Sequence, residues 1–300
     1  MKVITFSRSK FEKLKPLKLN HVNTEGDIFE FNQNGNSKIL KKLFYTQGPI
    51  FANKLYTLEM LDSHKEYLPD SFYIPDSLVS IDKTISGFTI PKVNGENLQD
   101  ILKDTSISNK EHIYYLRKIG EILDQMHNIR KYTDLKDLYL NDLHECNFMV
   151  NQNNRHVYVI DLDSCKICSN GIFPSKYLTD KAIIKNVPHK YHLSSDEKFN
   201  GCTVINENTD LYCYNIMILN YLYGADTSRF SIQEFYEYLN YLEYIGVNKE
   251  LLSKFKCIVD DGPNKNPANY LSSLTLEQVC RSKALVFNTV NNKLKSKRNI

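Results

Sequence analysis

Hydrophobic and polar residues alternate in two regions near the start of the chain, and this alternation predicts two β-hairpins. Residues 26–32 give the first strand, and the β-forming stretch 38–45 follows after an Asn-Gly turn. The second hairpin spans residues 78–93, and its second strand ends at Pro91, before another Asn-Gly turn. Between the hairpins, residues 49–68 predict a helix with one apolar stripe, which consists of Phe51, Leu55, Leu58 and Leu61.

The second half of the chain shows mainly the helical spacing of apolar residues. Residues 210–224 are apolar nearly all round, which predicts a central, buried helix. Residues 165–206 resemble a loop, and uninterrupted loops of this length are usually functional or mobile. A buried helix is predicted over 111–127 from the face formed by Ile113, Leu116, Ile119, Ile122, Leu123 and Met126. Further helices are predicted over 232–244, 249–259 and 276–286.

The composition is that of a globular protein, with 300 residues, 42% hydrophobic and 24% charged. The net charge of +3 is too small to indicate a nucleic-acid partner. Basic residues gather at 7–18 and 293–300, where we expect solvated, partly frayed ends, with a membrane-surface or acidic partner as the alternative. Seven scattered cysteines argue against a disulfide framework, and no signal peptide or membrane span is visible, so a cytoplasmic location is expected.

The candidate chemistry lies around a predicted hairpin in the stretch "NDLHECNFMVNQNNRHVYVIDLDS". Asn147 and Asp161 stand at the two ends of this hairpin, and they offer the oxygen ligands that Mg²⁺ prefers. Asp142 lies five residues before Asn147, where it could orient a hydroxyl or accept its proton during attack on a phosphate. Asp163 would point the same way as Asp161 on an extended backbone; it is either a second metal ligand or a turn acceptor.

"DLHECN" followed by "VYVIDLD" resembles the catalytic loop and metal-binding strand of the protein-kinase-like superfamily, which includes protein kinases and small-molecule kinases such as the aminoglycoside and choline kinases. The stretches "KILKKLFY", "GFTIPKVNGENL", "DLYCYNIMILNYLYG" and "NPANYLSSL" resemble its lysine strand, adenine connector, central helix and closing segment. The resemblance implies an α+β, bilobal fold. A small β-rich N-lobe with one helix would cover 1–93, and a larger helical C-lobe would cover 94–300, with a catalytic loop at 140–147 and a metal strand at 157–163.

The resemblance also implies ATP and Mg²⁺ as cofactors and transfer of the γ-phosphate to a hydroxyl. The expected acceptor is Ser or Thr of a protein, with a small-molecule hydroxyl as the alternative. Asp142 and Asn147 would be catalytic, and Asn147, Asp161 and Asp163 would hold the metal. His144 would contact phosphate or substrate, or else lie on the surface.

The lysine strand offers two candidates for the ligand of the α- and β-phosphates. Lys41 and Lys42 are adjacent and point to opposite faces of a strand. Lys42 precedes "LF", as in related bacterial sequences, and is therefore favoured. Its expected partner is Glu59, the only carboxylate within the apolar run of the following helix.

The connector and the glycine-rich loop complete the expected nucleotide site. Pro91 can offer only its C=O to adenine, whereas Val93 could donate its N–H. Of the family's glycine-rich loop only Gly26 is left, and Leu140–Asn141 replaces the usual His-Arg pair. These departures motivate a third hypothesis, a pseudokinase that binds nucleotide or a partner without turnover.

Two further features concern structure more than catalysis. The resemblance implies that Asp210 accepts hydrogen bonds from the backbone of the catalytic loop. Cys165 and Cys168 have C-x-x-C spacing, but no paired motif follows for zinc, so chance is favoured over a redox-sensitive pair.

Overall fold

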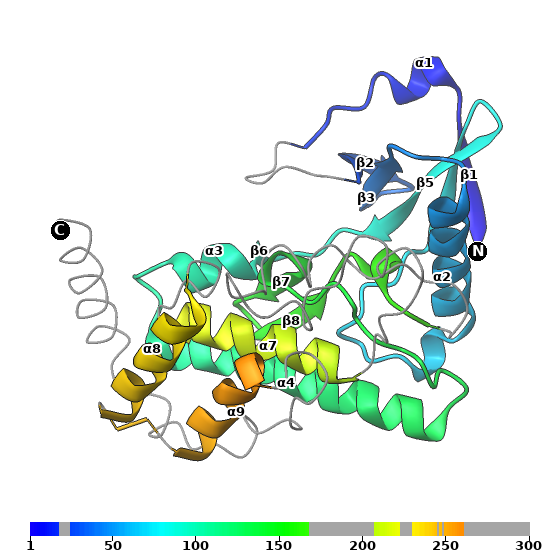
Figure 1. Ribbon diagram of the computed structural model, residues 1–300. Coiled ribbons are helices and arrows are strands. Elements are labelled where there is room, and N and C mark those ends of the chain that lie inside the picture. The colour runs from blue at the N-terminus through cyan, green and yellow to red at the C-terminus, as the bar shows by residue number, and fades with distance from the viewer. Residues whose placement is uncertain (18–24, 168–206, 223–229, 245, 248, 261–300) are drawn as a thin grey trace.

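The computed structural model describes residues 1–17, 25–167, 207–222, 230–244, 246–247 and 249–260 (Figure 1). They form an α+β structure in which a mixed five-stranded sheet carries one long helix, and a smaller three-stranded sheet lies among the remaining helices. The predicted helix over 276–286, the segment 266–274 and the basic stretch 293–300 lie outside the described residues.

The five-stranded sheet has the order β1-β4-β5-β3-β2, and β1 and β4 are its parallel pair. Its strands are β1 (Lys2–Phe6), β2 (Gly26–Gln33), β3 (Asn36–Leu43), β4 (Ser77–Ile81) and β5 (Thr84–Pro91). Both predicted hairpins, β2–β3 and β4–β5, are confirmed. Asn34 and Gly35 join β2 to β3 with φ values of 53° and 84°, the backbone that an Asn-Gly turn favours.

Strand β3 is covered on both faces, because its alternate residues pack against different partners. On one face, Leu40 packs with Phe29 and Val79. On the other face, Leu43 packs with Phe88 and with helix α2 (Pro49–Ser63). The strand is therefore central to both apolar clusters, and adjacent side chains along it enter different environments.

The N-terminal segment is ordered against the sheet, which corrects the expectation of a frayed end for residues 7–17. It forms β1 and the short helix α1 (Arg8–Phe11), and the ring centroid of Phe11 lies 4.9 Å from that of Phe29. Basic residues dominate the stretch, but its aromatic residues find an apolar sheet face on which to pack.

The remaining elements surround the smaller sheet, whose order is β6-β7-β8. They are β6 (Glu96–Asn97), α3 (Leu98–Lys103), α4 (Asn109–Tyr132), β7 (Phe148–Asn151), β8 (His156–Val159), α7 (Glu207–Leu222), α8 (Ile232–Tyr244) and α9 (Lys249–Asp260). Within the described ranges, the 3-10 turns are η1 (Lys65–Tyr67), η2 (Glu145–Asn147) and η3 (Leu162–Ser164). The helices predicted over 111–127, 232–244 and 249–259 are confirmed, and so is that over 210–224 as far as residue 222, because residues 223–224 lie outside the described residues.

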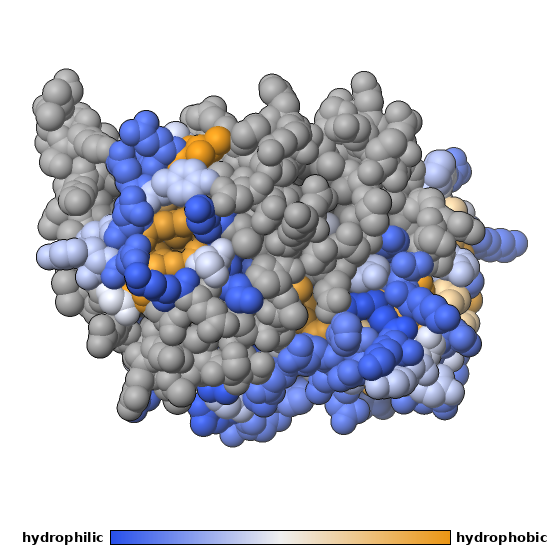
Figure 2. Space-filling model, turned by 60° about the horizontal axis from the view of Figure 1, so that its bottom comes forward, coloured by the Kyte–Doolittle hydropathy of each residue, from blue (hydrophilic) through white to orange (hydrophobic). Residues whose placement is uncertain are grey.

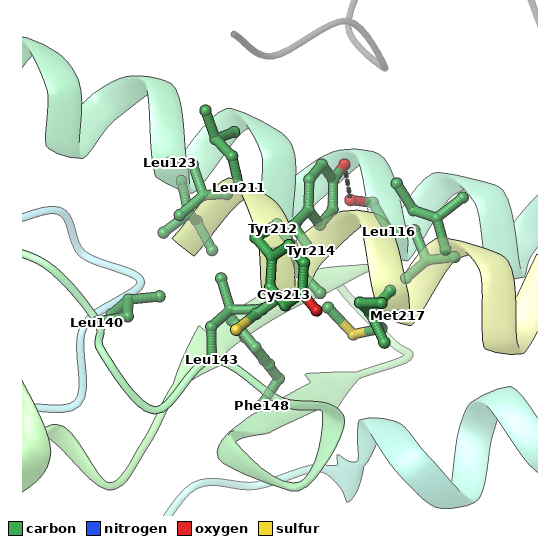
Figure 3. Packing of buried hydrophobic residues seen from close by; sticks show 14 of the residues in the cluster. Leu116, Leu123, Leu140, Leu143, Phe148, Leu211, Tyr212, Cys213, Tyr214 and Met217 are labelled. Carbon is green, nitrogen blue, oxygen red and sulfur yellow. Dashed lines mark hydrogen bonds between the residues drawn. The ribbon is translucent and has the colours of Figure 1, made fainter. Parts of the chain in front are cut away.

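Helix α7 is the centre of the largest apolar cluster, as its all-round apolar sequence predicts. It packs against α4, and the Tyr214 hydroxyl donates a hydrogen bond of 2.8 Å to the Leu116 carbonyl (Figure 3). On the face shown in Figure 2, hydrophilic residues make up most of the described surface that is visible, and hydrophobic residues appear in small areas between them. Among the described helices, none has the length and apolar character needed to cross a membrane.

Candidate active site

The loop before β7 is fixed by a buried carboxylate on α7. Asp210 accepts hydrogen bonds from the backbone N–H groups of Leu140 and Asn141 at 2.8 and 2.9 Å, as the resemblance implies for this acid. Leu140 and Leu143 are buried against the α7 cluster (Figure 3). Asn141 adopts φ 61°, a left-handed conformation in which Asn is enriched. The backbone of this loop is therefore held from two sides.

Asp142 and Asn147 are brought together by the same loop. The Asn147 amide nitrogen donates to the backbone carbonyl of Asp142 at 2.9 Å and to its carboxylate at 3.2 Å. These bonds use the nitrogen of the amide, so its oxygen is the atom suited to a metal. His144 Nε2 lies 3.6 Å from Asp142 Oδ2, while its Nδ1 accepts from the Cys146 backbone N–H at 3.2 Å. His144 thus faces Asp142.

Asp161 and Asp163 converge on one lysine, but not through an extended strand. Asp161 is left-handed, with φ 60° and ψ 43°, and η3 follows it directly. The expectation of parallel side chains on an extended backbone is therefore wrong, because a tight turn replaces the strand here. The turn brings both carboxylates to Lys41, whose Nζ lies 2.5 Å from Asp161 Oδ1 and 3.1 Å from Asp163 Oδ1.

Lys41, and not Lys42, faces these acids. Lys41 lies on the face of β3 that α2 covers, together with Leu43, and its side chain is 7% exposed. Lys42 lies on the opposite face, where its Nζ is 6.0 Å from the ring centroid of Phe11. The lysine that faces Asp161 and Asp163 is therefore Lys41 and not Lys42, which was favoured from the sequence, and the expectation that the two lysines occupy opposite faces is confirmed.

The expected acidic partner on α2 is also replaced. Glu59 is exposed. Apart from Asp161 and Asp163, the carboxylate that pairs with Lys41 among the described residues is that of Glu25, whose Oε2 lies 3.1 Å from the lysine Nζ. Helix α2 instead contributes Lys54, whose Nζ lies 2.7 Å from Asp163 Oδ2 and 3.0 Å from Glu25 Oε2. Neither Lys54 nor Glu25 was predicted from the sequence.

A signal for Lys54 was present in the helical pattern. Lys54 stands four residues before Leu58 and seven before Leu61, which places it on the buried stripe of α2. A lysine on an apolar stripe is rarely buried without a partner. Glu25 directly precedes the first strand of its hairpin and gives no comparable signal.

The lysines and carboxylates of this site shift one another's pKa values. Burial lowers the pKa of Lys41, but three nearby carboxylates outweigh it and raise that pKa well above its ordinary value. Burial alone would raise the pKa of Asp163, yet Lys41 and Lys54 hold it well below its usual range. Burial and the neighbouring charge of Asp163 raise the pKa of Asp161 to about 7. Burial also raises the pKa of the Cys165 thiol, so this cysteine is a poor nucleophile; Cys168 lies outside the described residues.

Three carboxylate groups of this region lie close enough together that they could share one small cation. Carboxylate oxygens of Glu25, Asp161 and Asp163 lie within 4.8 Å of one another. A cavity of about 10 Å³ is lined by Asp142, Asn147 and Asp161 among other residues, so the predicted metal ligands Asn147 and Asp161 face the same space. A cavity of this size holds a water molecule or an ion rather than a nucleotide.

The residues expected to contact the rest of the nucleotide lie around the two sheets. Gly26 begins β2 opposite Leu43, and an added Cβ would lie 2.3 Å from the Lys42 carbonyl oxygen, so close strand approach requires this glycine. Pro91 ends β5 and is exposed, and Val93 is half-buried in the connector to β6.

No family model matches this chain, and a search of curated proteins found no significant match.

Proposed function

We propose that this protein is a Mg²⁺-dependent ATP phosphotransferase with a bilobal, protein-kinase-like fold. The observation that carries the proposal is the convergence of Lys41 from the large sheet with Asp161 from the turn after β8. Beside this pair, the loop that holds Asp142 and Asn147 is anchored by Asp210. A phosphate-binding cation, a metal-binding carboxylate and an acceptor-binding carboxylate are the parts that phosphoryl transfer requires.

Each residue has a defined task in this proposal. Lys41 binds the α- and β-phosphates, while Asn147 and Asp161 hold Mg²⁺, and Asp163 holds the lysine. The metal ion neutralises charge on the phosphates when it is bound. Of the glycine-rich loop that covers the phosphates in the family, this proposal keeps Gly26. The connector at Pro91 and Val93 binds adenine.

The transfer step balances without a further reactant. Asp142 orients the acceptor hydroxyl and takes its proton, and the hydroxyl oxygen forms a bond to the γ-phosphorus. The bond from that phosphorus to the β–γ bridging oxygen breaks, and ADP leaves with the bonding electron pair. Positioning and charge neutralisation supply most of the rate.

The proposed acceptor is a Ser or Thr hydroxyl of a protein. The hydrogen bonds that Asp210 accepts from the backbone N–H groups of Leu140 and Asn141 support this choice, because they match the expected arrangement for a protein kinase. A small-molecule hydroxyl is the alternative, and Asp161-Leu162-Asp163 in place of Asp-Phe-Gly favours it. Incubation of the protein with radiolabelled ATP separates them, because label on the chain itself supports a protein acceptor.

ATP consumption with and without Mg²⁺ tests the activity. We expect Mg²⁺-dependent turnover that Asp142→Asn and Asp161→Asn each reduce by at least about 100-fold, the loss typical for catalytic groups. Asp70→Asn, at an exposed position, is the control. Equal background in the parent and in the Asp142→Asn variant would contradict the proposal.

One observation favours a scaffold without turnover as the second candidate. Lys41 and Lys54 pair with Glu25, Asp161 and Asp163, and we call these five residues the ion cluster. The charges of its two lysines are therefore compensated by protein carboxylates without a bound ligand. A scaffold would bind nucleotide, or a partner, and give no Mg²⁺-dependent release of ADP.

A further inference from the structure

Helix α2 directs a lysine, not an acid, into the ion cluster beside Lys41. The Lys54 side chain is 12% exposed, and its Nζ contacts Asp163 Oδ2 at 2.7 Å, Glu25 Oε2 at 3.0 Å and the Ser164 hydroxyl at 3.3 Å. Removing an ammonium group from water is unfavourable unless several partners compensate it. An apolar residue at this position would avoid that penalty, so packing alone does not explain the lysine.

The two ammonium groups share two carboxylate oxygens. Asp163 Oδ2 lies 3.3 Å from the Lys41 nitrogen and 2.7 Å from that of Lys54. Glu25 Oε2 lies 3.1 and 3.0 Å from the same two nitrogens. Lys41 and Lys54 are therefore neighbouring cations, bridged on one side by Asp163 and on the other by Glu25.

The two bridging carboxylates differ in their access to solvent. The Asp163 side chain is 0% exposed and closes the inner side of the cluster, whereas the Glu25 side chain is 41% exposed. Asp161 is 30% exposed and also belongs to the open side. A ligand that reached the lysines would therefore meet Glu25 first and leave Asp163 in place.

We propose that Lys54 is a second phosphate-binding residue, and that the Glu25 carboxylate occupies the position that a phosphate oxygen takes when a polyphosphate binds. The inference rests on the proposed function for the identity of the nucleotide. Phosphate oxygens replace Glu25 between the two ammonium groups, and Asp163 keeps both lysines in position. Two cations on one phosphate chain favour triphosphate over monophosphate, because each added phosphate group adds negative charge.

Lys54→Met and Glu25→Gln have opposite expected effects, which a purely structural ion pair would not produce. Dissociation constants for Mg·ATP, AMP and inorganic tripolyphosphate are measured by titration calorimetry. Lys54→Met should weaken Mg·ATP and tripolyphosphate by about tenfold or more and change AMP by less than about threefold. Glu25→Gln should tighten Mg·ATP by about threefold or more, because the competing carboxylate is removed. Lys65→Met, at an exposed lysine after α2, is the control.

A double variant covers the case in which Lys54→Met does not fold, and the comparison of ligands separates failure of this inference from failure of the proposed function. If Lys54→Met does not fold in a thermal melt, the double variant Glu25→Gln/Lys54→Met removes one charge of each sign and is compared with Glu25→Gln alone, relative to which it should bind tripolyphosphate about tenfold or more weakly. Unchanged Mg·ATP binding in either folded variant overturns the inference, as does equal weakening of AMP. A parent protein that binds tripolyphosphate through Lys54, but no adenine nucleotide, overturns the proposed function and supports the phosphate site.

Discussion

Lys41 and Asp161 form an ion pair across 120 residues of the chain. The lysine belongs to the central strand of the five-stranded sheet, and the aspartate ends the hairpin of the smaller sheet. The pair therefore depends on how the two sheets are placed and not on local sequence. A second ion pair lies beside it, between Lys54 on α2 and Asp163 in η3.

Lys41 and Lys42 provide a matched pair of variants. Lys41→Met is expected to lower kcat/KM for ATP by about 100-fold or more, because the cation beside Asp161 is lost. Lys42→Met is expected to change it by less than about threefold, since this lysine lies on the opposite face beside Phe11. Steady-state ATP consumption decides between the two residues, and equal losses would contradict the assignment of Lys41.

Asp210→Asn tests the anchor of the loop that contains Leu140 and Asn141. Each carboxylate oxygen accepts one backbone N–H, from Leu140 and Asn141, and an amide leaves one N–H without an acceptor. We expect the free energy of unfolding to fall by about 1–3 kcal/mol. Urea denaturation measures it, with the exposed Asp70→Asn as reference. A variant as stable as this reference would show that the two hydrogen bonds do not anchor the loop.

The hairpins and helices were predictable because their signals are local. Asn34 and Gly35 provide the two positive φ values of a tight turn, and the apolar stripes of α4 and α8 repeat at the helical period. Asp142, Asn147 and Asp161 were found by spacing around a hairpin, and the structure brings all three to one cavity. These features depend on short stretches of chain.

The choice between Lys41 and Lys42 could not be made locally. Alternation places them on opposite faces, but Leu40 and Leu43 make both faces of β3 apolar, so the pattern does not show which face α2 covers. Glu59 was chosen as the only acid in an apolar run, whereas the buried stripe contains Lys54 instead. Tertiary packing decided each of these positions.

Gly87→Ala tests whether the position of Lys41 depends on close approach of β3 and β5. A Cβ at Gly87 would lie 2.1 Å from the Lys41 carbonyl oxygen, so the two strands would have to separate. We expect a loss of about 1–3 kcal/mol in unfolding free energy, as for other overpacked sites. Chemical denaturation measures it, and Thr84→Ala at the exposed start of β5 is the control. Equal stability of the two variants would contradict tight pairing at this point.

The lowered pKa of Asp163 predicts how the free energy of unfolding changes at acidic pH. Lys41 and Lys54 hold the pKa of this buried carboxylate well below its usual range, although burial opposes them. In the unfolded chain the pKa is about 3.9, so the unfolded state takes up a proton first as the pH falls. The stabilisation from the ionised carboxylate is thus complete above about pH 5 and is lost progressively below about pH 4.

Asp163→Asn isolates this contribution, because an amide does not titrate in this range. The parent should be the more stable protein at pH 5, since Asn leaves two buried ammonium groups with one carboxylate fewer. Denaturant titrations at several pH values should show the advantage of the parent shrinking by about 1 kcal/mol between pH 5 and pH 3. An advantage that stays constant over this interval would mean that the carboxylate is not held ionised by the two lysines.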